Sequence, residues 1–346
     1  MFQALSEADI EPDWVTGVSI GAINSAIIAG NSKQWRLKRL RTFWERITER
    51  KIWNYTPDGD VFRKARNAAS SWMTLIQGQP GFFSPRHPTP WFSLAGAQSA
   101  TSYYDNAPLR ETLEDLVDFS LLNEKTMRFS VGAVNVLSGN FVYFDTTTHK
   151  IRPEHIMASG ALPPGCPAIE VDGELYWDGG LVSNTPLQWV VRGDTRNDTL
   201  VLQVDLWSAR GELPSDLNDV MARQKEIQYS SRTRANTDQF KEIQSVRVAL
   251  ANVLDQIPPD ILESEDGKLL RAVADRKVYQ IVHLIYRSKN YEVQSKDYEF
   301  SRTSMTDHWN AGYNDAIRTL RHPEALERPT DSVGVSTFDL AVNGRE

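Results

Sequence analysis

The spacing of apolar residues predicts a helix, a strand and a second helix within the first thirty positions. Apolar residues recur at helical spacing in residues 1–10, and this helical segment ends at Glu11-Pro12-Asp13. Residues 14–16 then have the character of a short strand. Small and apolar side chains over residues 22–29 predict a buried helix, which Gly30 closes. A tight turn therefore joins the strand to the second helix.

Strand patterns alternate with helical ones up to about residue 207. The expected helices span residues 32–50, 109–119 and a short segment after His149, and the expected strands span residues 128–136, 141–145, 174–177 and 199–206. Alternation of this kind is typical of an α/β fold, in which helices cover both faces of a mainly parallel sheet.

Beyond residue 207 the pattern becomes charged and helical. Residues 217–255, 267–286 and 304–320 each predict an amphipathic helix, and His283 is then a packed helix residue. We therefore expect two domains, residues 1–207 and residues 208–346, of which the second is mostly helical.

Residues 70–104 differ from both regions, because aromatic side chains stand among Gly, Pro and Ser. A lid over an acyl-binding cleft needs an apolar inner face and a mobile backbone, which this composition provides. A packed irregular loop has the same composition. The sequence leaves both interpretations open.

Composition and charge narrow the function classes. With 40% hydrophobic and 24% charged residues the chain resembles ordinary globular proteins, and no run reaches the roughly 18 apolar residues of a membrane span. A net charge of −7 argues against a nucleic-acid partner and makes any peripheral membrane contact apolar. Cys166 is the only cysteine, and residues 1–10 lack the features of a signal peptide. We expect a cytoplasmic protein.

The first candidate for chemistry is Ser19, in the sequence Gly17-Val18-Ser19-Ile20-Gly21. A serine between a strand and a helix N-terminus occupies a sharp turn that presents its hydroxyl, and flanking glycines relieve crowding there. The helix that begins near Ile20 adds free N–H groups beside a developing oxyanion. We interpret the motif as a nucleophile elbow, with a plain structural turn as the alternative.

A serine nucleophile needs a base, and Asp178 is the better candidate. It follows the expected strand at residues 174–177, at the sheet edge where catalytic groups of α/β folds gather. Gly179 and Gly180 come next and let the backbone turn close to another element. The sequence therefore predicts that Asp178 acts directly on Ser19.

A histidine base is the alternative. His283 lies in an apolar run, and three other histidines precede Asp178, which breaks the Ser, Asp, His order of α/β-hydrolases. These three are His87, His149 and His155. His308 and His322 remain open as bases.

Three ordered blocks, Pro12–Asn24, Ala158–Pro163 and Trp177–Pro186, resemble the patatin-like phospholipase family. The stretch Tyr291–Trp309 resembles the C-terminal domain of a bacterial subgroup. The resemblance implies a three-layer α/β/α sandwich, a Ser-Asp dyad without histidine, and hydrolysis of ester bonds in lipids. We expect neither a metal nor a cofactor.

The family also carries a first strand and a glycine-rich loop whose N–H groups supply the oxyanion hole, and this segment is missing ahead of the opening helix. We therefore expect an incomplete amino terminus in which Ile20 N–H is the remaining donor. Turnover should be low, because loss of one donor typically costs about 10² to 10³.

The favoured function is a serine lipid acyl hydrolase, in which Ser19 attacks an acyl ester, Asp178 takes its proton and an acyl-enzyme forms. One alternative is a catalytically impaired lipid-binding or scaffold protein of the same fold. Another is a Ser-His-Asp esterase with His308 or His322 near Ser19. The lipid head group and the oligomeric state do not follow from the sequence.

Overall fold

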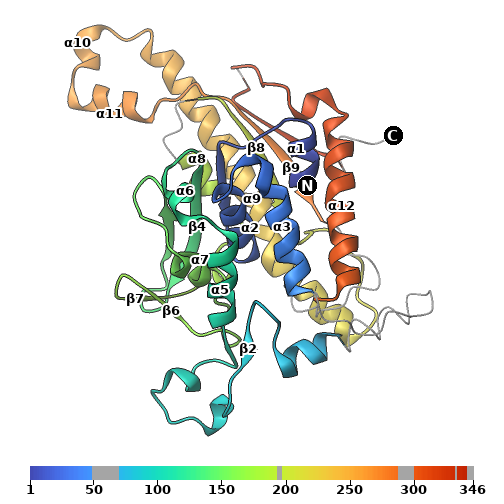
Figure 1. Ribbon diagram of the computed structural model, residues 1–346. Helices are drawn as coiled ribbons and strands as arrows, with labels where there is room; N and C mark the ends of the chain where they lie inside the picture. Colours follow the sequence, from blue (N-terminus) through green and yellow to red (C-terminus); the bar gives the residue numbers. More distant parts are fainter. Residues whose placement is uncertain (49–69, 193–196, 287–299, 332, 341–346) are drawn as a thin grey trace.

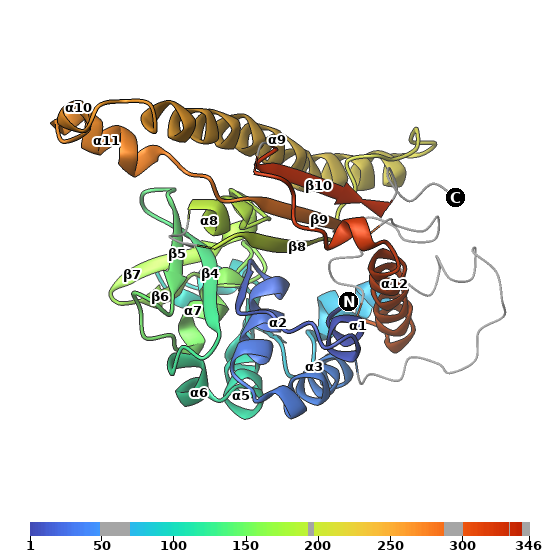
Figure 2. The same ribbon diagram turned by 90° about the horizontal axis from the view of Figure 1, so that it is seen from above.

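The computed structural model describes residues 1–48, 70–192, 197–286, 300–331 and 333–340 (Figure 1). Part of the stretch Tyr291–Trp309, up to residue 299, lies outside the described residues. Strands form the middle of the molecule, with α9 on one side and α2, α3 and α5 on the other (Figure 2).

The helices are α1 (Phe2–Glu7), α2 (Ile20–Ala29), α3 (Lys33–Ile47), α5 (Ala107–Leu116), α6 (Phe119–Asn123), α7 (Pro153–Ser159), α8 (Leu187–Arg192), α9 (Leu217–Leu254), α10 (Pro259–Leu262), α11 (Glu265–Val273) and α12 (Arg302–Leu320). The strands are β1 (Trp14–Gly17), β2 (Ser84–Pro85), β3 (Tyr104–Asp105), β4 (Arg128–Asn135), β5 (Phe141–Asp145), β6 (Ile169–Val171), β7 (Glu174–Asp178), β8 (Thr199–Asp205), β9 (Tyr279–Ile285) and β10 (Val335–Asp339). Short 3-10 helices are η1 (Pro90–Phe92), η2 (Gln98–Ala100), η3 (Gly179–Leu181) and η5 (Pro323–Ala325).

Strand β4 organises the first sheet. β1 pairs with its first half in parallel, ending at Gly17 opposite Val131, and β7 pairs with its second half, where Asp178 lies opposite Ala133. β5 pairs with both halves, so it must occupy the other edge of β4. β1 and β7 therefore share one edge and meet end to end beside Gly132.

A hydrophobic core holds the helices against this sheet. Side chains of α2, α3, α5 and α7 pack on β4, whose residues after the first are all buried. α2 is composed almost entirely of small and aliphatic residues, and Ile23, Ala26 and Ile27 are fully buried. The buried helix expected after Ser19 is confirmed.

The second sheet has the order β10-β9-β8 and is parallel throughout. Side chains alternate along β9, because Tyr279 and Ile281 face α8 and α9 while Val282 and Leu284 face the side of η5. Each face of the central strand is thus covered by other elements.

Two expectations about these strands are wrong. Residues 267–286 do not form one helix, since α11 ends at Val273 and β9 follows it, so His283 is a strand residue. The first sheet is mixed rather than mainly parallel, because the short turn between β4 and β5 can join only antiparallel strands. The α/β class with helices on both faces and a helical carboxy-terminal region is confirmed.

The region beyond residue 207 packs closely on the rest of the chain. β8 pairs with β9 along its whole length, so one sheet includes strands from both expected domains. α12 also lies against α1, where Trp309 Nε1 donates to Gln3 Oε1 at 2.8 Å and the Tyr313 hydroxyl to Glu7 Oε2 at 2.7 Å.

Residues 86–103 project from the body as a lobe between the paired strands β2 and β3 (Figure 1). Its base is packed, with the Phe83 and Tyr104 rings 4.7 Å apart. Its tip is open to solvent, since Trp91 and Phe92 are exposed. The expected lid or packed loop is thus packed only at its base.

Candidate active site

Ser19 lies at the turn between β1 and α2, in a backbone conformation that is rare for a residue with a side chain. Its φ is 56° and its ψ is −126°. Strained backbone of this kind persists only where surrounding contacts enforce it, and it occurs often at catalytic turns. The geometry agrees with the sharp turn expected from the sequence.

The two glycines of the motif play different parts. A Cβ atom at Gly17 would lie 2.2 Å from the carbonyl carbon of Gly21, so no other residue fits there. A Cβ atom at Gly21 would meet nothing within 4 Å. Steric crowding therefore explains why position 17 needs a glycine. It does not explain the glycine at position 21, which faces open space at the start of α2.

A second serine fixes the backbone of the turn. The Ser19 N–H donates to Ser159 Oγ at 2.9 Å, and Ser159 is fully buried at the end of α7. In the next turn, Ala161 O accepts from the Asp178 N–H at 3.0 Å. One segment thus binds the backbone of both candidate residues. The block Ala158–Pro163 marks this segment in the sequence, but the sequence pattern predicts no role for Ser159 within it.

Asp178 ends β7 and is 2% exposed. Its Oδ1 accepts from the Gly180 N–H at 2.7 Å. Burial raises the pKa of Asp178 from the ordinary 3.8 to about 6, although hydrogen bonds from the Ser19 hydroxyl and the Gly180 N–H lower it in part. The structure therefore brings the carboxylate to the Ser19 hydroxyl and makes it a stronger base than a solvated aspartate.

Gly179 and Gly180 allow this close approach. A Cβ atom at Gly179 would lie 2.7 Å from Gly132 O and 2.9 Å from Val18 Cγ1, which belong to β4 and to the elbow. A Cβ atom at Gly180 would lie 3.1 Å from Asp178 Oδ1. Because these two residues have no side chains, the turn after β7 packs directly against β4 and the elbow.

Ile20 is the first residue of α2, where backbone N–H groups have no acceptor in a preceding helical turn. The N–H of Gly21 already donates to Val18 O at 3.0 Å. Ile20 N–H is thus the candidate oxyanion donor in this turn.

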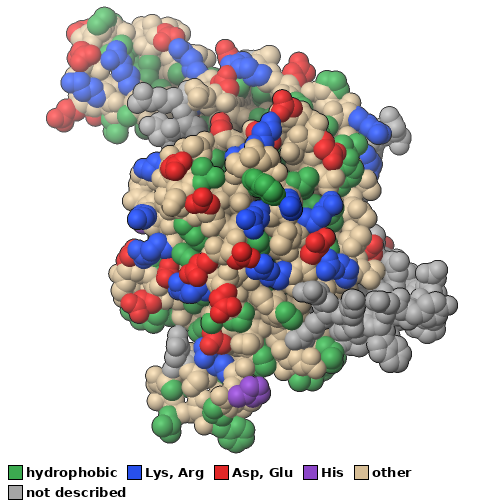
Figure 3. Space-filling view, viewed as in Figure 1, with side chains coloured by type: hydrophobic (Ala, Val, Ile, Leu, Met, Phe, Trp, Pro, Cys, Tyr) green, Lys and Arg blue, Asp and Glu red, His purple; other side chains and the backbone are tan. Residues whose placement is uncertain are grey.

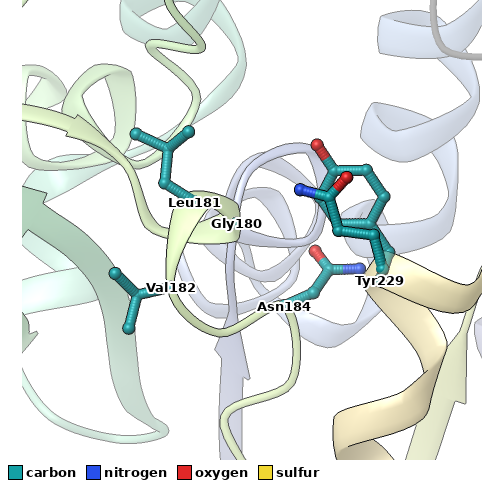
Figure 4. Close-up of a pocket in the computed structure, with 6 residues that line it drawn as sticks. Gly180, Leu181, Val182, Asn184 and Tyr229 are labelled. Atoms are coloured by element: carbon teal, nitrogen blue, oxygen red, sulfur yellow. The ribbon is translucent and has the colours of Figure 1, made fainter. Parts of the chain in front are cut away.

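A shallow hollow lies at Gly180, two residues after Asp178. Gly180, Asn184 and Tyr229 help to line it, and its empty volume of about 240 Å³ includes open solvent (Figure 4). Tyr229 belongs to α9 and stacks on Trp207 with ring centroids 5.4 Å apart. The region beyond residue 207 therefore contributes a wall next to Asp178.

The two histidines left open by the sequence make other contacts. The His308 ring packs edge-on against Tyr286 at 5.0 Å between centroids. His322 Nδ1 lies 3.3 Å from Glu324 Oε1, and its ring contacts Phe338. The hydrogen bonds that lower the pKa of Asp178 come from Ser19 and Gly180 and involve neither histidine.

In the described ranges, His, Cys, Asp and Glu side chains do not gather in groups of three or more that could hold a metal ion. Among the same residues, the helices are too short or too polar to cross a membrane.

The fold and the site together define an α/β protein with a strained serine elbow beside a buried carboxylate. A family model described as patatin-like phospholipase matches residues 1–190, more than half of the sequence, and a second, described as patatin phospholipase, matches residues 227–332. The chain belongs to the patatin-like phospholipase family. This membership supports hydrolysis of lipid acyl esters in general.

No curated protein matches the sequence. Among solved structures, the crystal structure of VipD from Legionella pneumophila has 14% sequence identity and a TM-score of 0.36, over 92% of this chain and 63% of that one. This chain thus spans less than two thirds of that protein's length.

Proposed function

We propose that the protein is a serine hydrolase of lipid acyl esters that uses a Ser19–Asp178 dyad. The observation that carries the proposal is the buried Asp178 carboxylate at the hydroxyl of a serine in a strained elbow. A weakly acidic alcohol such as serine attacks only when a base removes its proton, and Asp178 is the base within reach.

In the first step Ser19 Oγ attacks the ester carbonyl, and its proton passes to Asp178. The oxyanion forms beside the N-terminus of α2, where Ile20 N–H stabilises it. Asp178 returns the proton to the departing alcohol, and the acyl group stays on Ser19 Oγ. Water then attacks this acyl-enzyme and gives a proton to Asp178, which returns that proton to Ser19 Oγ as the fatty acid leaves.

The raised pKa of Asp178, about 6, suits this role. A general base works best when its pKa lies near the working pH, since it is then both deprotonated and able to hold a proton. At neutral pH most of the Asp178 population is a carboxylate.

A fluorophosphonate probe, which reacts with activated serines, tests the proposal. The wild-type protein should be labelled at Ser19, as peptide mass spectrometry would show, and Ser19→Ala and Asp178→Asn should each lose labelling by at least about 10²-fold. Ser120→Ala, at an exposed serine, is the control and should label normally.

Failure to label a folded wild-type protein would favour the alternative of a catalytically impaired lipid-binding protein. Labelling that survives in Asp178→Asn but disappears in His308→Ala or His322→Ala would favour a histidine base.

A further inference from the structure

The lobe formed by residues 86–103 exposes three large apolar side chains at its tip. Trp91 is 80% exposed, Phe92 84% and Leu94 85%. Figure 3 shows hydrophobic side chains at the end of the lobe, away from the charged body. Such exposure costs solvation free energy, and contiguous exposed apolar groups mark interaction surfaces.

The charge of this region is equally unusual. Residues 70–104 contain no Asp or Glu, although these make up 45 of 346 residues in the chain, or about one in eight. Arg86 is the only Lys or Arg among them. A segment without carboxylates can approach lipid head groups and acyl chains with little loss of charge solvation.

The backbone of the lobe is stiffened. Pro85 at the end of β2, Pro88 and Pro90 restrict φ at the base and in the first half of the lobe, and Arg86 N–H donates to Tyr103 O at 3.0 Å across its base. A preorganised loop loses less conformational entropy when its side chains enter another phase.

Contacts at the base join the lobe to the candidate active site. Tyr103 N–H donates to Pro164 O at 3.1 Å, and Tyr104 N–H donates to Gly165 O at 2.9 Å. The next residue, Cys166, has its pKa raised to about 12 by burial and then by the charge of Asp178, while Arg86 lowers it. The base of the lobe therefore lies close to Asp178.

We propose that the lobe is a lipid-surface anchor, in which Trp91, Phe92 and Leu94 enter the interfacial layer of a membrane or lipid aggregate. Tryptophan suits that layer, because its ring is apolar and its N–H remains hydrogen-bonded. The tip has no cluster of basic residues and the whole chain carries a net charge of −7, so the attraction is apolar. This inference goes beyond the proposed hydrolysis and does not require catalysis.

Flotation with phosphatidylcholine vesicles tests the anchor. The full chain carrying Ser19→Ala is used, so that hydrolysis does not change the vesicles. It should bind, and binding should change less than twofold between 0.1 and 0.5 M NaCl, because screening weakens only electrostatic attraction. Adding W91D, F92D and L94D together should lower the partition coefficient at least tenfold.

Leu137→Asp is the matched control, because Leu137 is 90% exposed on the turn between β4 and β5, away from the lobe. It should leave vesicle binding unchanged. Thermal unfolding of each variant establishes that it is folded. The anchor is wrong if the parent protein does not bind, if the triple variant binds equally well, or if Leu137→Asp lowers binding as much. It is also wrong if the triple variant instead abolishes a dimer seen by sedimentation, since the tip would then bind a second copy.

Discussion

The elbow at Ser19 and the lobe at residues 86–103 each contain a glycine that the structure favours, but for different physical reasons. At Gly17 a side chain would collide with backbone atoms of the next turn. At Gly96 nothing lies within 4 Å, and only its φ of 90° favours glycine. Packing enforces the elbow, whereas local backbone preference shapes the lobe. The catalytic candidate is therefore held in one geometry, and the lobe leaves its side chains free to meet a partner.

The largest expected effect is a loss of catalysis on substitution of Asp178, the buried carboxylate beside the elbow. Asp178→Asn should lower kcat/KM on a chromogenic acyl ester by about 10² to 10⁴, because asparagine cannot accept the serine proton. In the wild-type protein kcat/KM should rise with pH and level off above an apparent pKa of about 6. A pH profile that is flat between 5 and 8 would show that another group is the base.

The next effect tests whether packing enforces the elbow. Gly17→Ala should destabilise the fold by more than about 3 kcal/mol or prevent folding, because the new Cβ atom would clash with backbone atoms of Gly21 and Ala22, which cannot move aside as a flexible side chain can. Gly96→Ala should cost only about 1 to 2 kcal/mol, the strain of a positive φ. Urea unfolding followed by circular dichroism measures both, and equal losses would contradict the comparison.

The buried, ionised Asp178 carboxylate should also lower the free energy of unfolding. Its folded-state pKa of about 6 exceeds the ordinary value of 3.8, so the folded protein holds the proton more tightly between these pH values. Stability should therefore fall as the pH rises from about 4 to about 6 and then stay constant. Asp178→Asn removes this loss and should stabilise the protein on the order of 1 to 3 kcal/mol at pH 8, with no comparable gain near pH 4. Unfolding at the two pH values checks the sign.

An effect on stability of similar size but opposite sign is expected at Ser159. Ser159→Ala leaves the Ser19 N–H without its acceptor in a partly buried place, which should cost about 1 to 3 kcal/mol. Turnover should fall as well, while the pH profile keeps its apparent pKa, because Ser159 positions the turn and does not exchange the proton. A shifted pKa with unchanged stability would point to a direct chemical role.

The smallest effect lies at the tip of the lobe. Phe92→Asp should change the free energy of unfolding by less than about 0.5 kcal/mol, because the ring is almost fully exposed in the folded chain. Urea unfolding in the absence of lipid measures it. A loss above about 2 kcal/mol would mean that the ring packs against the protein in solution.

Local patterns predicted much of the first sheet and its helices. The strand, turn and helix around Ser19 follow from residues within fifteen positions of each other, and so does the hairpin of β4 and β5. The sequence predicts a helix where the structure has β9, because the short apolar run Tyr279–Ile285 shows no periodicity that separates a strand from a helix. Its burial between β8 and β10 depends on partners 80 residues earlier (Thr199 beside Tyr279) and 56 residues later (Val335 beside Tyr279), which no local pattern contains.

The sequence by itself determined which residues carry candidate chemistry: a serine that must sit in a turn, an aspartate that must end a strand, and glycines beside each. Only the tertiary structure decided that they meet. β1 and β7 share one edge of β4, so that Gly17 and Asp178 end on either side of Gly132. Ser159 then accepts from the elbow backbone, although 140 positions separate the two serines. Turn preferences act between neighbours in the chain, whereas strand pairing and burial join distant segments, and only burial could raise the pKa of Asp178 toward that of a working base.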